Sequence, residues 1–138
     1  MTKIGLRPAA FIVGVGLLAA GGYLWWQQDK ASMDADAGLS IPEFSEVAVA
    51  GQQIFNKNCS ACHGSSANGS ENGPPLIHKI YEPGHHSDEA FYRAVAMGSR
   101  QHHWRFGDMP AQPQVSPPEV TRIIAYIREL QVANGIGH

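Results

Sequence analysis

The most constraining feature of this chain is the stretch Cys59-Ser60-Ala61-Cys62-His63, which has the pattern C-x-x-C-H. In this pattern each thiol can add to one vinyl group of a haem, and the histidine that follows can bind the iron. The stretch therefore predicts one covalently attached haem c, with His63 as an iron ligand. A cofactor tethered in this way does not need a deep pocket to be retained, so a small domain suffices.

Two other kinds of site use paired cysteines. A zinc site needs four ligands, and the 2 cysteines of this chain would have to be completed from its 7 histidines. No H-x₃₋₅-H pair follows Cys62 at the spacing usual for a zinc finger. A thiol redox motif normally accompanies a βαβ pattern, which the sequence does not show. We therefore prefer the haem interpretation to both.

Met109 is the best candidate for the second iron ligand. It lies in the turn-rich segment Phe106-Gly107-Asp108-Met109-Pro110, where Gly107 gives the backbone freedom and Pro110 stiffens it. Ligation by His63 and Met109 would close both axial positions of the iron, which favours electron transfer over catalysis. Met97 ends a predicted helix before a glycine, and we interpret it as a helix or core residue.

Four motifs in this order resemble a class I c-type cytochrome of the small bacterial kind. The resemblance covers residues 43 to 132 and rests on Gly51–Gly64, Gly73-Pro74-Pro75-Leu76, the Met109 loop, and Val120–Leu130. It implies an all-α cytochrome c fold with three main helices and long loops around the haem. It also implies that the Pro74 carbonyl accepts a hydrogen bond from the His63 ring, and that Leu76 belongs to the cofactor site.

The helices can also be predicted from the residues. Ile41-Pro42-Glu43 is expected to open the first helix, with Ser40 as its cap, and Gly51 within it suggests a close helix crossing. Ser87 is expected to cap the second helix. Ser116 and Glu119 have the spacing of a capping box for the third. Apolar residues at helical spacing predict the buried faces: Phe44, Val47, Ile54 and Phe55 on the first helix, and Val120, Ile123, Ile124, Ile127 and Leu130 on the third, with Tyr126 expected near Gly51.

Polar and aromatic residues between the haem motif and Met109 suggest further contacts. Trp104 and Arg105 are candidate donors to the haem propionates, because an indole N–H and a guanidinium both hydrogen-bond carboxylates. The pairs His85-His86 and His102-His103 are interpreted as exposed loop residues. A metal site or an alternative haem ligand remains open for them.

The N-terminus predicts a location. Lys3 and Arg7 precede an uncharged apolar run from Pro8 to Trp26, which ends in an aromatic cluster. We expect residues 1–26 to form an uncleaved transmembrane signal-anchor, although a cleaved signal peptide remains an alternative. The positive-inside rule then places the N-terminus in the cytoplasm and the haem domain in the periplasm, at a bacterial inner membrane.

The rest of the domain plan follows from composition and charge. Residues 27–42 are expected to form a linker, flexible unless it packs on a larger complex, and residues 43–138 the haem domain. All 12 acidic residues follow Trp26, as do all but two of the 10 basic residues, and no basic patch indicates nucleic-acid binding.

Two classes of function fit these observations. In the first, the protein carries single electrons between respiratory or photosynthetic complexes, as a tethered shuttle or a fixed subunit. Its partners would then be a quinol-cytochrome c oxidoreductase, a terminal oxidase or a similar complex. In the second, the protein is a haem enzyme or a sensor of gases or peroxide, with a sixth ligand that is readily displaced. The first is preferred, because the Met109 loop supplies a ligand for the second axial position.

Overall fold

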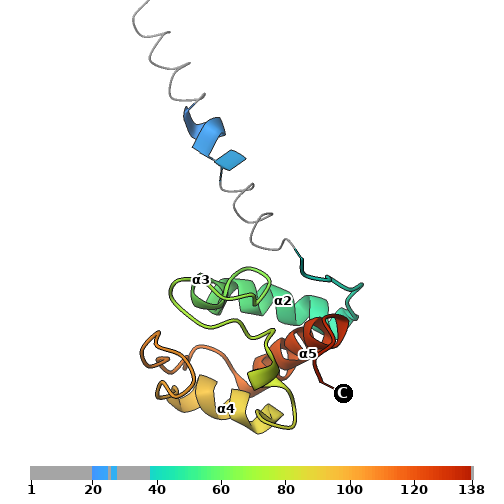
Figure 1. Cartoon of the computed structure of the whole chain (residues 1–138), viewed down its shortest axis with the longest axis vertical. Helices are drawn as coiled ribbons and strands as arrows, with labels where there is room; N and C mark the ends of the chain where they lie inside the picture. Colours follow the sequence, from blue (N-terminus) through green and yellow to red (C-terminus); the bar gives the residue numbers. More distant parts are fainter. Residues whose placement is uncertain (1–19, 25, 28–37, 138) are drawn as a thin grey trace, which may run out of the picture. The chain divides into compact units, whose positions relative to one another are not determined.

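The computed structural model describes residues 20–24, 26–27 and 38–137. The chain divides into two compact units, Met1–Ala37 and Gly38–His138. The second unit contains, in order, α2 (Glu46–Asn58), α3 (Ser60–His63), the 3₁₀ turn η1 (Lys79–Tyr81), α4 (Asp88–Met97) and α5 (Pro117–Ala133) (Figure 1). The described residues form no strands, only two isolated bridges. The predicted mostly helical fold is therefore confirmed.

The first helix starts later than the sequence suggested. The predicted start at residues 41–43 with Ser40 as cap is wrong, because α2 begins at Glu46 and Ser45 is its N-cap. The Ser45 hydroxyl accepts a hydrogen bond of 3.2 Å from the N–H of Ala48. It also donates to Glu129 of α5 at 2.6 Å, while the Ser45 N–H donates to the same carboxylate at 3.0 Å. This cap therefore joins the start of α2 to α5.

Helices α2 and α5 lie side by side and form the main helix contact of the domain (Figure 1). They meet at Gly51, where a Cβ atom would lie 1.9 Å from the backbone oxygen of Arg122 and 3.1 Å from the backbone nitrogen of Ile123. Only glycine permits so close an approach of two helix backbones. The close crossing predicted from Gly51 is confirmed, with the α5 backbone as its neighbour.

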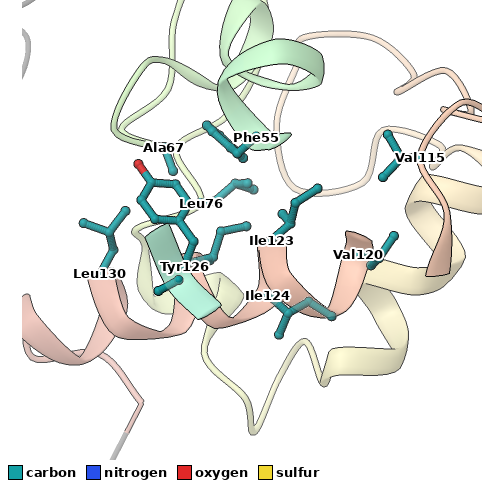
Figure 2. Packing of buried hydrophobic residues seen from close by; sticks show 11 residues of the cluster. Phe55, Ala67, Leu76, Val115, Val120, Ile123, Ile124, Tyr126 and Leu130 are labelled. Carbon is teal, nitrogen blue, oxygen red and sulfur yellow. The ribbon is translucent and has the colours of Figure 1, made fainter. Parts of the chain in front are cut away.

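Aromatic and aliphatic side chains from α2, α5 and the loops fill the core next to this crossing (Figure 2). The Tyr126 ring packs against Phe55 and Phe44, with ring centroids 5.4 Å and 5.2 Å apart. The Tyr126 hydroxyl donates to the Ser65 carbonyl at 3.3 Å. Val47, expected on the buried face, is instead 51% exposed. The buried apolar residues are Ala48, Phe55, Ala67, Leu76, Val115, Val120, Ile123, Ile124, Tyr126, Ile127 and Leu130.

The ends of α4 and α5 follow their local sequence signals. The Ser116 hydroxyl and N–H both donate to Glu119, at 2.6 and 2.8 Å, within the predicted capping box of α5. Ser87 stands at the N-cap of α4, but its hydroxyl donates to Glu89 at 2.7 Å rather than capping the backbone. Gly98 ends α4 with a φ of 76°, a conformation that glycine adopts without strain.

The described residues of the N-terminal unit, 20–24 and 26–27, are helical. Tyr23, Leu24 and Trp26 are each more than half exposed. Among the helices of the described residues, none is both long and apolar enough to cross a membrane. Most of the predicted anchor, residues 1–26, lies outside the described residues, as do residues 28–37 of the predicted linker.

Candidate functional site

A cavity of about 440 Å³ opens among α4, α5, the C-x-x-C-H turn and the loop that carries Met109. Its size falls in the range of roughly 300–1,000 Å³ that is typical of cofactor sites. Predicted site residues from distant parts of the chain line this cavity together: Cys59, His63, Pro74, Leu76, Trp104 and Met109. Its apolar walls come from Phe55, Tyr81, Phe91, Ala94, Val95, Ile123 and Ile127.

The C-x-x-C-H stretch forms one helical turn. Cys59 is the N-cap of α3, Cys62 and His63 lie within the turn, and Gly64 ends it with a φ of 78°. The two cysteines form no disulfide with each other. Burial, together with the neighbouring Cys62, raises the pKa of Cys59 to about 11, so its sulfur is favoured in an uncharged form.

The orientation of His63 is fixed by the segment that follows α3. The Nδ1–H of its ring donates to the Pro74 carbonyl at 2.9 Å, which leaves the Nε2 atom free to bind a metal. Gly73 allows this contact, because a Cβ atom there would lie 2.8 Å from the Cys62 carbonyl oxygen. Burial lowers the pKa of His63, although the bond to Pro74 opposes the shift, so the ring is favoured in its neutral, ligating form.

The loop that carries Met109 is anchored to the end of α4. The Ser99 N–H donates to the Met109 carbonyl at 2.9 Å, and the Met109 N–H donates to the Ser99 carbonyl at 2.8 Å. Gly98 permits this pairing, since a Cβ atom there would lie 2.5 Å from the Met109 carbonyl oxygen. Gln112 adds a further hydrogen bond from its N–H to the Val95 carbonyl at 2.7 Å. Met97 is the last residue of α4, as the helix part of our interpretation expected, but it is 71% exposed and is not a core residue. It also lines the cavity.

Trp104 has the one buried polar side-chain atom, within the described residues, that finds no hydrogen-bond partner. Burial raises the pKa of the nearby Tyr81, and the Trp104 side chain partly offsets this rise. A buried donor of this kind normally has an acceptor, and a haem carboxylate would be a suitable one. Arg105 is exposed and does not line the cavity, whereas Arg93 and Arg100 do.

The two histidine pairs come together from separate loops. The rings of His85 and His103 have centroids 5.2 Å apart, and those of His86 and His102 5.8 Å apart. Desolvation lowers the pKa of His86, the hydrogen bond to Ile80 opposes the shift, and the charges of His85, His102 and Arg128 add to it. Desolvation and the three neighbouring histidines also lower the pKa of His103. The sequence showed two His-His pairs but not that they meet.

Several residues that shape the site were missed in the sequence. Gly98 and Ser99 hold the Met109 backbone. The one sequence signal for this contact was the position of Gly98 directly after a predicted helix. Gln131 is 0% exposed and donates to the carbonyls of Leu76 and Tyr81, at 2.9 and 3.0 Å, both on cavity-lining residues. Its position on the apolar face of α5 gave no hint of this role.

The residues present fit a haem, since they combine the tethering cysteines, an oriented imidazole, a thioether, an apolar cavity and an unpaired buried donor. Comparison with known families gives a match of the cytochrome c family model to residues 48–131. Comparisons with the curated proteins and with the solved structures give no match. The matched region includes every residue that lines the cavity.

Proposed function

Because this chain belongs to the cytochrome c family and carries a covalent haem c, we propose that it is a membrane-anchored carrier of single electrons. The observation that carries this proposal is that His63 and Met109 line one cavity together with Cys59. A bound haem supplies one-electron chemistry, and its reduction potential depends on the two axial ligands. Cys59 and Cys62 would hold its edge, with His63 and Met109 as the ligands.

The protein's own residues favour electron transfer over catalysis. The hydrogen bond from His63 to Pro74 fixes one ligand, and the paired backbones of Ser99 and Met109 hold the other segment in place. Ligands held by the backbone need little rearrangement, so a substrate would not easily displace them. A haem enzyme or a sensor of gases or peroxide would instead need one position that opens readily.

Exchange of single methionines tests the ligand assignment. Met109→Ala should abolish the low-spin spectrum of the intact protein and lower its reduction potential, because a sulfur ligand favours the reduced iron. Met97→Ala is the matched control, since Met97 lines the same cavity but is 71% exposed. If Met97→Ala produces these changes and Met109→Ala does not, the assignment of Met109 is wrong.

We further propose that residues 1–26 anchor the protein in a bacterial inner membrane, with the haem domain in the periplasm. The uncharged run from Pro8 to Trp26, preceded by Lys3 and Arg7, supports this. A respiratory or photosynthetic complex at the same membrane, such as a quinol-cytochrome c oxidoreductase or a terminal oxidase, would be the redox partner.

Intact-mass measurement of the protein from membrane fractions tests the anchor. Retention of residues 1–26 is expected, and a soluble mature form that begins near Gly22 would contradict it. The complex that co-purifies from solubilised membranes would identify the partner.

A further inference from the structure

Four histidines from two loops converge at the haem cavity, and three of them, His86, His102 and His103, also line it. His85 and His86 precede α4, while His102 and His103 lie on the segment that leads to Met109. The Nε2 atoms of His85 and His103 are 3.3 Å apart, and those of His86 and His102 are 3.5 Å apart. We propose that this histidine cluster binds one divalent transition-metal ion through its imidazole nitrogens.

The hydrogen bonds of His86 and His102 show which ring nitrogens are free. The Nδ1 atom of His86 lies 2.6 Å from the Ile80 carbonyl oxygen, and that of His102 lies 2.7 Å from the Arg100 carbonyl oxygen. A carbonyl only accepts, so both Nδ1 atoms carry the proton. In the neutral rings the facing Nε2 atoms are therefore both acceptors. Two acceptor nitrogens 3.5 Å apart repel each other unless they share a cation. Metal-bound histidines usually donate their other ring N–H to a carbonyl, as the Nδ1 atoms of His86 and His102 do here.

The spacing of the nitrogens suits a metal ion of the size of Zn²⁺. Two nitrogen ligands of a tetrahedral Zn²⁺, each about 2.0–2.1 Å from the metal, lie about 3.3–3.4 Å from one another. The His85–His103 distance of 3.3 Å matches this value, and the His86–His102 distance of 3.5 Å is slightly longer. His85, His86 and His103 offer nitrogens that all lie within 4.8 Å of one another. Rotation of the exposed His85 and His103 rings can bring the three ligands together around the half-buried His86. Imidazole ligands favour Zn²⁺, Cu²⁺ and Ni²⁺ over the alkaline-earth ions.

The backbone beneath the cluster is held in place by α5. Arg128 donates to the His86 carbonyl at 2.7 Å and to the Tyr81 carbonyl at 2.7 Å. Its positive charge would oppose a nearby cation, but an ion pair of 3.0 Å with Asp88 offsets that charge. The loop before α4 is thus fixed on one side, and a bound metal would join it to the segment that carries Met109.

Titration of the haem-loaded, untagged full-length protein with Zn²⁺, after treatment with a chelator, tests the proposal. Isothermal calorimetry should show one equivalent bound at micromolar concentration, and zinc X-ray absorption should show nitrogen ligands at about 2.0 Å. His85→Ala should weaken binding by more than about tenfold, because even the loss of an outer partner of a metal ligand costs roughly 10–100-fold. His85→Ala/His103→Ala, which removes one ligand from each loop, should abolish it.

His78→Gln is the matched control. The His78 ring packs edge-on against Trp104, with centroids 5.1 Å apart, and its Nδ1 accepts from the Ile80 N–H, so this histidine is outside the cluster. The variant should bind Zn²⁺ as the wild type does, and unchanged haem absorption and circular dichroism should verify folding of all variants. Absence of Zn²⁺ binding by the wild type, meaning that the rings share only a proton, would overturn the proposal. Undiminished binding by the double variant, or its loss in His78→Gln, would also overturn it.

Discussion

The close approach of α2 and α5 makes Gly51→Ala the sharpest test of the fold. The added Cβ atom would lie 1.9 Å from the Arg122 backbone oxygen, where 3.4 Å is an ordinary contact. The two helices would therefore have to move apart by about 1.5 Å, because neither neighbour is a flexible side chain. Overpacking against backbone costs about 3 kcal/mol.

Separation of the helices would also loosen the contact between Phe55 and Tyr126, both almost fully buried. A gap of about 1.5 Å between these rings would cost about 1–2 kcal/mol in lost van der Waals contacts and buried apolar area. Alanine returns about 1 kcal/mol through its higher helix propensity. We therefore expect the free energy of unfolding of Gly51→Ala to fall by about 3–4 kcal/mol.

Guanidinium unfolding of the haem-loaded protein, followed by circular dichroism, measures this change. Gly84→Ala is the matched control, since nothing lies within 4 Å of the added Cβ atom and the backbone φ there is not positive. That variant should be neutral or slightly stabilised. A Gly51→Ala protein as stable as the wild type would refute the reasoning that the helices cross in direct backbone contact at this residue.

Two further predictions concern polar groups on α5. Gln131→Leu should lower the free energy of unfolding by about 2–3 kcal/mol, because the buried amide donates to the carbonyls of Leu76 and Tyr81; an unchanged denaturation midpoint would contradict this. Hydrogen bonds from Ser116 lower the pKa of Glu119 below its ordinary 4.5. The depressed pKa means that this contribution to stability is complete above pH 4.5 and is lost as the pH falls through the folded-state pKa. Glu119→Gln should therefore lower stability at neutral pH and flatten its decline in acid, as measured by denaturation between neutral pH and pH below 4; parallel acid profiles would contradict this.

Local sequence signals predicted the elements whose formation depends on local chemistry. The capping box at Ser116 and Glu119 placed the start of α5, because both partners lie within one turn. Gly51, in the middle of α2, predicted a close crossing of two helices. Glycine destabilises a helix, so its presence there indicates that a larger side chain would not fit. The C-x-x-C-H pattern predicted the haem because, as in the capping box, all the partners are local: both thiols and the histidine lie in one turn.

Long-range pairings were not available from the sequence. The sequence predicted Ser40 as the cap of the first helix, whereas the cap of α2 is Ser45. Ser45 is held by Glu129 of α5, which lies 84 residues away in the chain. The meeting of the His85 and His103 loops depends on how the chain folds around the cavity. Arg105 was predicted to contact a haem propionate because a guanidinium hydrogen-bonds carboxylates. Its side chain is exposed and does not line the cavity, whereas that of the neighbouring Trp104 does.

Carbon monoxide binding by the reduced, intact protein is the most direct test of the central claim, that His63 and Met109 close both axial positions of the haem iron. The wild-type protein should not bind the gas readily, and Met109→Ala should bind it at once because one position is open. Rapid binding by the wild type would contradict the carrier and favour an enzyme or a sensor.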